Sequence, residues 1–343
     1  MNKDSRSFAS DNSSGIHPDI MKAIQEANHG HVLAYGSDIY TERATNKFKE
    51  HFGKNSDPYI VFGGTPANVI GLSIVTQPYN SVICAVSAHV LAFECGATER
   101  FIGCKLIGIP TDDGKITPEQ IKPYLQFGNS HVSPPKVISI TQPTELGTLY
   151  TVKEIKAIAD LAHKNNMYLH MDGARLSNAA ASLGLKFKEF TADAGVDILS
   201  FGGTKNGLML GDAVICMNKD ISKDAMYIRM EGMQLASKMR FISAQFEAYL
   251  SNDLYLKNAA HANKIAKLFE KELKKIPEIK ITQKVQTNAV FAVIPKKYIK
   301  KLQEAFYFHV MDEEKSIVRL MTSFDTTEED IYEFTALAKK IIK

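Results

Sequence analysis

Short apolar runs that alternate with amphipathic stretches constrain the fold of this chain more than any other feature. The stretch 151–165 has apolar residues at helical spacing, among them Val152, Ile155 and Ile158. Strands that alternate with such helices are typical of an α/β protein with a mainly parallel sheet. We expect buried strands at 59–62, 81–86, 105–109, 137–141, 167–171, 198–201 and 213–217.

The pattern changes after Met217 and predicts a second, smaller C-terminal α/β domain. A chain of 343 residues, 45% of them hydrophobic, is long enough for one large domain and a smaller partner. We place the boundary near 250–253, so that residues 1–250 form the large domain and 251–343 the small one. The predicted elements of this part are long helices at about 221–250 and 252–276, strands at 279–282, 290–294 and 317–321, and helices near 297–308 and from Thr327.

Charge and cysteine content exclude several classes of protein. Lys+Arg 41 against Asp+Glu 38 gives a net charge of +3, without a clustered basic tract, so nucleic acid is not expected as a partner. The four cysteines show no metal-ligand spacing, and we assign no metal site. Residues 1–15 lack the apolar core of a signal peptide, and no apolar run is long enough to span a membrane. We therefore expect a soluble, cytoplasmic protein that does not bind membranes.

Two ionisable residues stand where apolar strands end. Asp172 follows the strand 167–171, and Lys205 follows the strand 198–201 after a glycine pair and Thr204. Taken singly, an Asp after a strand is more often a helix cap, and a Lys in a Gly-rich loop is usually solvated. Ligands of open α/β sheets bind beyond the carboxyl ends of the strands. Together the two residues favour pyridoxal phosphate (PLP), with the lysine as Schiff-base partner and the aspartate holding the pyridine nitrogen protonated.

Two further segments are placed to complete such a site. The segment 62–68 joins a strand to a helix, where Thr65 suits the N-cap and Pro66 the first helical position. The exposed N–H groups and the helix dipole favour a phosphate there, although an ordinary strand–helix turn has the same appearance. His89 follows the strand 81–86 and could stack on the pyridine ring. A packed or helix-capping histidine is an equally good interpretation of His89.

Two arginines are candidates for binding a carboxylate. Arg175 lies about one helical turn after Asp172, close enough to reach the ring hydroxyl of PLP or a substrate carboxylate. Arg319 lies inside the apolar segment 316–323, where a charge is rarely left unpaired. Planar, two-pronged binding of a carboxylate is what arginine does best. A structural salt bridge is the alternative for Arg319.

These residues, in this order, resemble the low-specificity threonine aldolases, PLP enzymes of fold type I, the aspartate aminotransferase type. The resemblance extends from Ser10 to Leu320, and the segments 202–207 and 237–245 are closest to the branch that accepts phenylserine. It implies a homo-oligomer, with a dimer of dimers (a homotetramer) as our expectation, and active sites at subunit interfaces. The roles that it implies are Lys205 as Schiff-base lysine, Asp172 as partner of the pyridine nitrogen and His89 as ring-stacking residue; Gly64, Thr65, Thr204 and Arg240 as phosphate ligands; Ser10, Arg175 and Arg319 as carboxylate ligands; and Tyr35 as a residue near the active site.

One position departs from the family pattern. Many members carry a histidine between the strand 137–141 and the following glycine, and it contacts the substrate hydroxyl. This chain has Glu145 at that place. The group that takes the hydroxyl proton is therefore open among Glu145, His89 and a water molecule.

The resemblance implies a lyase that reversibly cleaves the Cα–Cβ bond of β-hydroxy-α-amino acids. L-Threonine, L-allo-threonine and phenylserine would give glycine and an aldehyde. Because a fold alone does not choose the reaction, β-elimination or transamination on the same scaffold is the alternative. A PLP-binding protein without turnover is the remaining one. The sequence specifies neither the preferred aldehyde, nor the threo or erythro preference, nor a structural cation.

Overall fold

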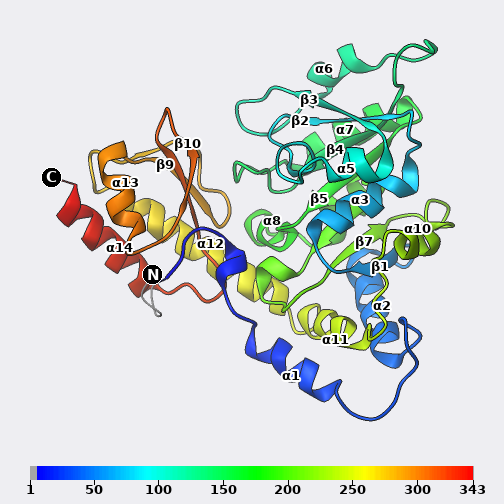
Figure 1. Ribbon diagram of the computed structural model, residues 1–343, viewed down its shortest axis with the longest axis horizontal. Helices are drawn as coiled ribbons and strands as arrows, with labels where there is room; N and C mark the ends of the chain where they lie inside the picture. The colour runs from blue at the N-terminus through cyan, green and yellow to red at the C-terminus, as the bar shows by residue number, and fades with distance from the viewer. Residues whose placement is uncertain (1–5, 343) are drawn as a thin grey trace.

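The computed structural model describes residues 6–342, which form two β-sheets with helices around them. The larger sheet has seven strands in the order β1-β7-β6-β5-β4-β2-β3, and the smaller has four in the order β10-β11-β9-β8. Figure 1 shows the smaller sheet to one side of the larger, with helix α12 (Leu254–Leu273) extending between them.

The strands of the large sheet correspond to the seven runs predicted from the sequence. Strands β2 to β6 are parallel to one another, whereas β7 is antiparallel to both β6 and β1. The predicted mainly parallel α/β sheet is therefore confirmed. The strands are β1 (Asp57–Val61), β2 (Ser81–Ala85), β3 (Lys105–Ile109), β4 (Pro135–Thr141), β5 (Tyr168–Gly173), β6 (Ile198–Gly202) and β7 (Asp212–Cys216).

Helices cover both faces of the large sheet, so its strands are apolar on both sides. Side chains of a strand alternate between the faces. In β2, Ile83 and Ala85 pack with one core cluster, whereas Val82 and Cys84 pack with another. Helix α3 (Gly64–Val75) lies in the second cluster, together with α5 (Ala97–Ile102). Helices α2 (Ile39–Phe52), α7 (Val152–Lys164), α8 (Leu176–Leu183) and α11 (Arg240–Tyr249) contribute to the first.

The prediction of one long helix at about 221–250 is wrong. The segment forms two helices, α10 (Ala225–Glu231) and α11, separated by residues 232–239. The first ends because Gly232 packs against α3, where a Cβ would lie 2.3 Å from Ile70 Cδ1. The next residue, Met233, has a φ of 60°, outside the helical region. The other helices of this part are α1 (Pro18–Glu26), α4 (His89–Ala92), α6 (Pro118–Ile121) and α9 (Phe187–Phe190).

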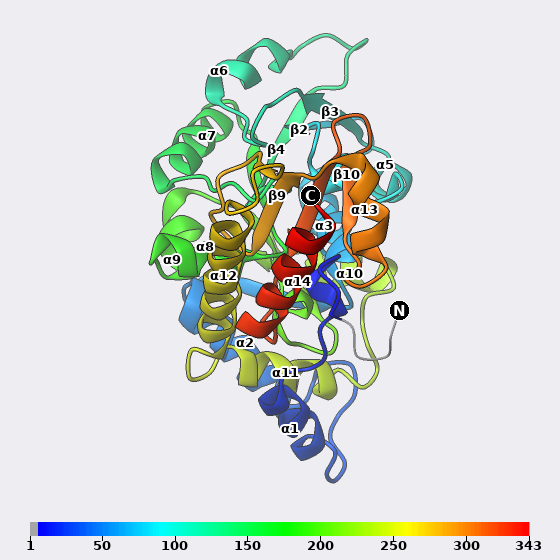
Figure 2. The ribbon, with the colours of Figure 1, turned by 90° about the vertical axis from the view of Figure 1, so that its left-hand side faces the viewer.

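The small sheet has a core of its own, to which the N-terminal segment contributes. Phe8 packs among the C-terminal aromatic residues, its N–H donates to Tyr307 O (2.8 Å), and its carbonyl accepts from Met321 N (2.8 Å). Figure 2 shows this segment beside α14. The elements are β8 (Lys280–Ile281), β9 (Ala289–Val293), α13 (Lys296–Gln303), β10 (His309–Asp312), β11 (Ile317–Met321) and α14 (Glu328–Ile341). Within the described residues, the helices are too short or too polar to cross a bilayer.

Candidate active site

The register of two parallel strands brings Asp172 and Lys205 to the same edge of the large sheet. Asp172 in β5 is paired with Ser200 in β6, and Lys205 lies in the short turn Thr204–Asn206 that follows β6. The carboxyl ends of parallel strands share one edge, which is where such sheets bind ligands. We call the residues gathered there the strand-end site.

Two glycines allow the Lys205 turn to lie against the end of β5. A Cβ on Gly202 would stand 2.3 Å from Ala174 O, and one on Gly203 would stand 2.6 Å from Leu208 Cδ2. Asp212 then fixes the turn, because its Oδ1 accepts from Gly203 N (2.9 Å) and Thr204 N (3.3 Å). The glycine pair is thus a packing requirement that positions Lys205.

Neighbouring charges shift the pKa of the Lys205 amine. Burial lowers the pKa of its amine, and the positive charge of Arg175 lowers it further, whereas Asp11, Asp172 and Asp212 act in the opposite direction. A lowered pKa increases the fraction of neutral amine, which is the nucleophilic form.

Asp172 is 4% exposed and both of its oxygens are hydrogen bonded. Its Oδ1 accepts from Ala174 N (3.0 Å), and its Oδ2 accepts from Asn68 Nδ2 (2.9 Å). The same Asn68 nitrogen donates to Glu94 Oε1 (2.8 Å). Sequence reasoning missed Asn68 and Glu94. The only signal was a polar residue on the otherwise apolar helix α3 and an acid shortly after His89.

His89 is held by two carboxylates. Its backbone N–H donates to Glu145 Oε1 (2.7 Å), and its Nδ1 lies 2.8 Å from Glu94 Oε1. Glu145 Oε1 also accepts from Thr141 Oγ1 (2.9 Å), whereas its Oε2 is buried without a hydrogen-bond partner in the described residues. Burial and the charge of Asp172 raise the pKa of Glu145 to about 7. Glu145 therefore exchanges its proton near neutral pH.

Arg175 forms a two-pronged ion pair with Asp11, which is 1% exposed. Arg175 Nε lies 2.6 Å from Asp11 Oδ2, and Nη2 lies 2.9 Å from Oδ1. Asn288 Nδ2 also donates to Asp11 Oδ2 (3.0 Å). Ser10 precedes this carboxylate, and its Oγ accepts from Asn12 N (3.1 Å). The pair joins the N-terminal segment to the end of β5.

Arg319 is a partly unsatisfied cation beside this pair. Its Nη2 donates to Ala9 O (3.1 Å), but its Nε is buried without a hydrogen-bond partner in the described part of the chain. Burial and the nearby charge of Arg175 lower its pKa to about 10, while Asp11 acts in the opposite direction. Within residues 6–342 Arg319 hydrogen bonds to a carbonyl rather than to a carboxylate, so the alternative of a structural salt bridge has no partner there.

Helix α3 begins two residues earlier than the sequence suggested. Gly63 is the N-cap, so Thr65 and Pro66 occupy the second and third helical positions, and the predicted capping role of Thr65 is wrong. The extended backbone at Gly63 starts the helix without a side-chain cap. The first N–H groups therefore have no side-chain acceptor and can receive an anion. A Cβ on Gly64 would lie 3.4 Å from Asp212 Oδ2, so a side chain there would crowd this edge.

Tyr35 lies on a loop, and Arg240 is the first residue of α11. Tyr35 is 57% exposed, and its N–H donates to Ser237 O (3.0 Å). Arg240 Nη1 donates to Gly30 O (3.1 Å) and His29 O (3.4 Å). Among residues 6–342 these hydrogen bonds do not connect either side chain to Lys205 or Asp172.

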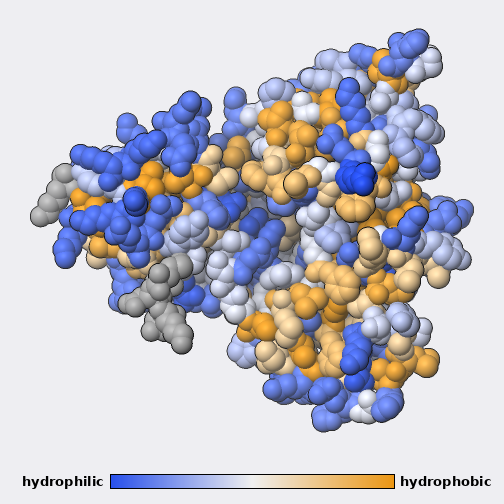
Figure 3. Space-filling model, viewed as in Figure 1, coloured by the Kyte–Doolittle hydropathy of each residue, from blue (hydrophilic) through white to orange (hydrophobic). Residues whose placement is uncertain are grey.

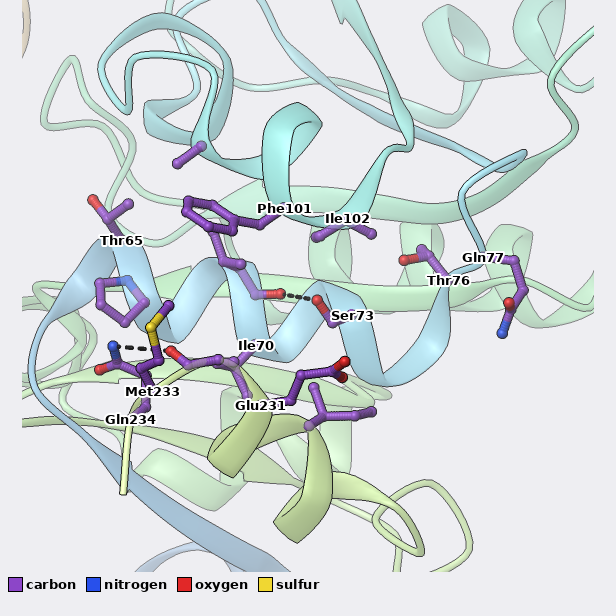
Figure 4. A pocket seen from close by; sticks show the side chains of 15 residues that line it. Thr65, Ile70, Ser73, Thr76, Gln77, Phe101, Ile102, Glu231, Met233 and Gln234 are labelled. Atoms are coloured by element: carbon purple, nitrogen blue, oxygen red, sulfur yellow. Dashed lines mark hydrogen bonds between the residues drawn. The ribbon is translucent and has the colours of Figure 1, made fainter. Parts of the chain in front are cut away.

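A cavity of about 660 Å³ extends along α3 from Thr65 to Thr76, between α5 and α10. Figure 4 shows Phe101, Met233 and Ile70 among the side chains that line it. The strand-end residues Asp172 and Lys205 do not line it. The cavity and the strand-end site therefore share only the first turn of α3.

Comparisons with known proteins agree with this geometry. The family model described as "Beta-eliminating lyase" matches residues 7–297. A low specificity L-threonine aldolase of Pseudomonas sp. (strain NCIMB 10558) is 40% identical over 338 residues, which are 98% of this chain and 98% of the relative. The solved threonine aldolase of Leishmania major covers 98% of this chain and 100% of its own, with a TM-score of 0.93 and 28% identity.

A more distant structure identifies the fold alone. Thermus thermophilus aspartate aminotransferase superposes with a TM-score of 0.70 at 14% identity, covering 98% of this chain and 92% of its own. The two-sheet architecture is therefore that of fold type I enzymes, as predicted. Because the family model and the aldolase relative both span most of the sequence, the chain belongs to the beta-eliminating lyase family and, within it, to the low specificity L-threonine aldolases.

Proposed function

We propose that this protein cleaves L-threonine, L-allo-threonine and related β-hydroxy-α-amino acids to glycine and an aldehyde, and catalyses the reverse reaction. It is a PLP-dependent lyase. One observation carries the proposal: Lys205, Asp172 and the Arg175–Asp11–Arg319 group lie together in a chain that is 40% identical to a threonine aldolase. An amine, a ring-nitrogen partner and a carboxylate-binding group are the parts that this chemistry needs.

The strand-end site has side chains of the kinds that would hold PLP. The uncapped first turn of α3, with Thr65 and Thr204, would hold the phosphate. Asp172 would keep the pyridine nitrogen protonated, and His89 would cover the ring. When bound, PLP supplies an electron-accepting ring that takes up the electrons of the Cα–Cβ bond as it breaks. Lys205 would join the cofactor through its neutral amine.

The charges near Arg319 suit a substrate with one carboxylate. Two guanidinium groups, Arg175 and Arg319, face one internal carboxylate, Asp11, which leaves one positive charge for the substrate. The unpaired Nε of Arg319 is a hydrogen-bond donor available for the substrate carboxylate. Holding the carboxylate sets the orientation of the bonds at Cα and so selects the bond that breaks. A transaminase that binds a second carboxylate would need more cationic groups than this.

Glu145 is our candidate for the group that takes the β-hydroxyl proton. Its pKa of about 7 allows it to be ionised and then protonated at working pH, and its Oε2 has no other hydrogen-bond donor in the described residues. Its Oε1 holds the backbone of His89. Glu145 thus stands where the family pattern has a histidine, next to the residue expected to cover the ring.

β-Elimination is the second candidate reaction, because the matching family model carries that description. The same residues would bind an amino acid whose β-substituent leaves with its electrons. Products separate the two reactions, since threonine cleavage gives glycine and acetaldehyde, whereas elimination gives ammonia and a keto acid. We expect aldehydes from L-threonine, L-allo-threonine and phenylserine. Keto acid without aldehyde would reject the aldolase proposal.

The first prediction concerns Lys205. Borohydride reduction of the PLP-loaded protein, followed by peptide mapping, should place the phosphopyridoxyl group on Lys205. Lys205→Ala should lose both this label and turnover, because the amine that would join the cofactor is gone. Lys115→Ala is a control on a surface ion pair with Glu154 and should keep both. A label on a different lysine would reject the assignment.

We also propose that a second copy of the chain covers the surface around the α3 cavity. Phe101 is 67% exposed and Met233 is 71% exposed there. Figure 3 shows hydrophobic side chains gathered over this half of the molecule, whereas the surface of the small-sheet half is mainly hydrophilic. Exposed apolar area of this kind marks association surfaces. Tyr35 and Arg240 would then serve a site at the subunit interface, in a homotetramer.

The proposal also includes a location in the cell and a boundary between the two domains. The four cysteines are free, three buried and one exposed, which supports a reducing, cytoplasmic location. The proposed domain boundary at 250–253 lies just before α12, which begins at Leu254. Leu254 and Tyr255 still pack in the core of the large sheet, whereas the residues from Ile265 onward pack mainly in the second core.

A further inference from the structure

A chain of three hydrogen bonds connects Asp172 to His89 through two residues without an assigned role. Asn68 Nδ2 donates to Asp172 Oδ2 at 2.9 Å and to Glu94 Oε1 at 2.8 Å. Glu94 Oε1 then meets His89 Nδ1 at 2.8 Å. These residues come from α3, from β5 and from the α4 region, which are distant in sequence. These hydrogen bonds therefore cross the strand-end site from Asp172, the proposed partner of the ring nitrogen, to His89, the residue proposed to cover the ring.

The chemistry of the neighbours fixes the direction of these hydrogen bonds. Asn68 stands between two carboxylates, so its amide must present the NH₂ group to both and uses one N–H for each. Asn68 is 1% exposed and the side chain of Glu94 is 0% exposed, so water does not compete for either group. An ionised Glu94 can only accept a hydrogen bond. The proton of a neutral His89 must therefore be on Nδ1, which leaves Nε2 without a proton.

The backbone holds Glu94 in this inward position. Cys95 and Gly96, which follow it, have φ values of 52° and 70°. Two successive left-handed residues form a tight turn, and a non-glycine residue there is strained. The turn is closed by a hydrogen bond from Ala97 N to Glu94 O (2.9 Å). Such strain persists where the surrounding structure requires it, and here the turn follows a carboxylate that contacts His89 Nδ1.

We propose that Glu94 and Asn68 are positioning residues, which act on PLP through His89 and Asp172. Glu94 fixes the imidazole of His89 with the proton on Nδ1, and Asn68 couples that orientation to the carboxylate of Asp172. Glu145 holds the backbone of the same histidine, so Glu94 has the separate task of orienting the ring. This proposal rests on the proposed function, which gives Asp172 and His89 their roles toward PLP. It adds the two residues that hold Asp172 and His89 in place.

The test compares two substitutions of Glu94 in the full-length protein. Glu94→Leu removes the acceptor, whereas Glu94→Gln keeps an oxygen that can accept from His89 and Asn68. The ¹⁵N NMR signals of the histidine ring report which nitrogen carries the proton, and His89→Asn identifies the signal among the 10 histidines. PLP affinity is measured by spectral titration, and both variants are first checked for folding by circular dichroism.

We expect wild-type His89 to be protonated on Nδ1, with and without PLP. Glu94→Leu should mix the two tautomers and weaken PLP binding about 10-fold or more, as expected for the loss of a hydrogen bond to a charged group. Glu94→Gln should keep the Nδ1 tautomer and bind PLP within about threefold of wild type. Asn68→Ala should keep the tautomer but weaken PLP binding, because Asp172 loses its partner. If Glu94→Leu does not fold, Glu94→Met carries the same expectation.

A matched control and two contrary results make the test decisive. Glu272 on α12, which pairs with Lys275 just beyond the helix, is also a buried carboxylate, and Glu272→Leu should leave both readouts unchanged. An unchanged tautomer and PLP affinity in Glu94→Leu would reject the proposal. Equal loss in Glu94→Gln and Glu94→Leu would reject it as well. These readouts do not require threonine cleavage, so failure of the proposed function would be recognised separately by the absence of aldehyde.

Discussion

At the scale of single residues, Glu145 combines a hydrogen-bonded oxygen and an unpaired one in a single buried carboxyl group. Burial and Asp172 raise its pKa to about 7, so its ionised fraction increases as the pH rises through neutrality and falls below it. A base must be ionised to accept a proton. Aldolase turnover should therefore decrease as the pH falls below about 7.

Glu145→Gln tests this role. The amide keeps the size of the side chain but cannot accept the hydroxyl proton, so turnover should fall about 10²- to 10⁴-fold. The pH dependence near neutrality should disappear at the same time. PLP retention should be little changed, which is measured by the absorbance of the bound cofactor. Cleavage of threonine at the wild-type rate would instead assign the base to His89 or to water.

Arg319→Lys tests the carboxylate-binding role at the same scale. Lysine keeps the positive charge but loses the planar, two-pronged geometry. The KM for threonine should rise about 10- to 100-fold, the effect of one or two hydrogen bonds to a charged group. PLP affinity should stay unchanged. Equal loss of PLP binding and of thermal stability would show that Arg319 is structural.

At the scale of elements, the close approach of β6 to the end of β5 determines where Lys205 lies. Gly202→Ala places a Cβ 2.3 Å from Ala174 O, which is backbone and cannot move independently. We expect a loss of about 3 kcal/mol in the free energy of unfolding, measured with urea. Gly15→Ala is the control, because a Cβ there meets nothing within 4 Å. Equal stability of the two variants would mean that the strand end is not tightly packed.

The same elements show how far the sequence could predict the structure. Strands buried on both faces, such as β2 and β6, are mostly apolar, so their positions were visible as runs. Strand β10 was missed because its side chains are exposed or only half-buried and leave no apolar signal. The break between α10 and α11 was missed because it depends on contact between Gly232 and α3. Local patterns do not contain such tertiary contacts.

In the candidate site, too, some residues could be predicted from the sequence and others could not. Asp172 and Lys205 were found because each follows an apolar strand, a local feature. Asn68 and Glu94 were missed because their roles arise from pairing with each other and with Asp172, across 26 and 104 residues of sequence. The Asp11–Arg175 pair spans 164 residues, and a single sequence cannot reveal it.

At the scale of the whole molecule, the exposed apolar surface around the α3 cavity predicts self-association. Met233→Asp places a charge on that surface and should lower the mass measured by sedimentation velocity, because burying an unpaired charge in an interface is unfavourable. Tyr332→Asp is the control, at an exposed aromatic residue on α14 of the small-sheet half. A wild-type protein that sediments as a monomer would contradict the proposal.

The segment 6–11 contacts residues of both the large and the small sheet regions. Arg6 pairs with Asp325 (2.9 Å), Ala9 O accepts from Arg319, and Asp11 pairs with Arg175. During synthesis, the N-terminal segment emerges first but must wait for the last strands before it can take this position. The proposed carboxylate-binding group therefore cannot assemble before β11 has been synthesised. Until Arg319 has left the ribosome, Asp11 and Arg175 lack this neighbour, so the substrate-binding group that we propose forms only after residue 319 has been synthesised.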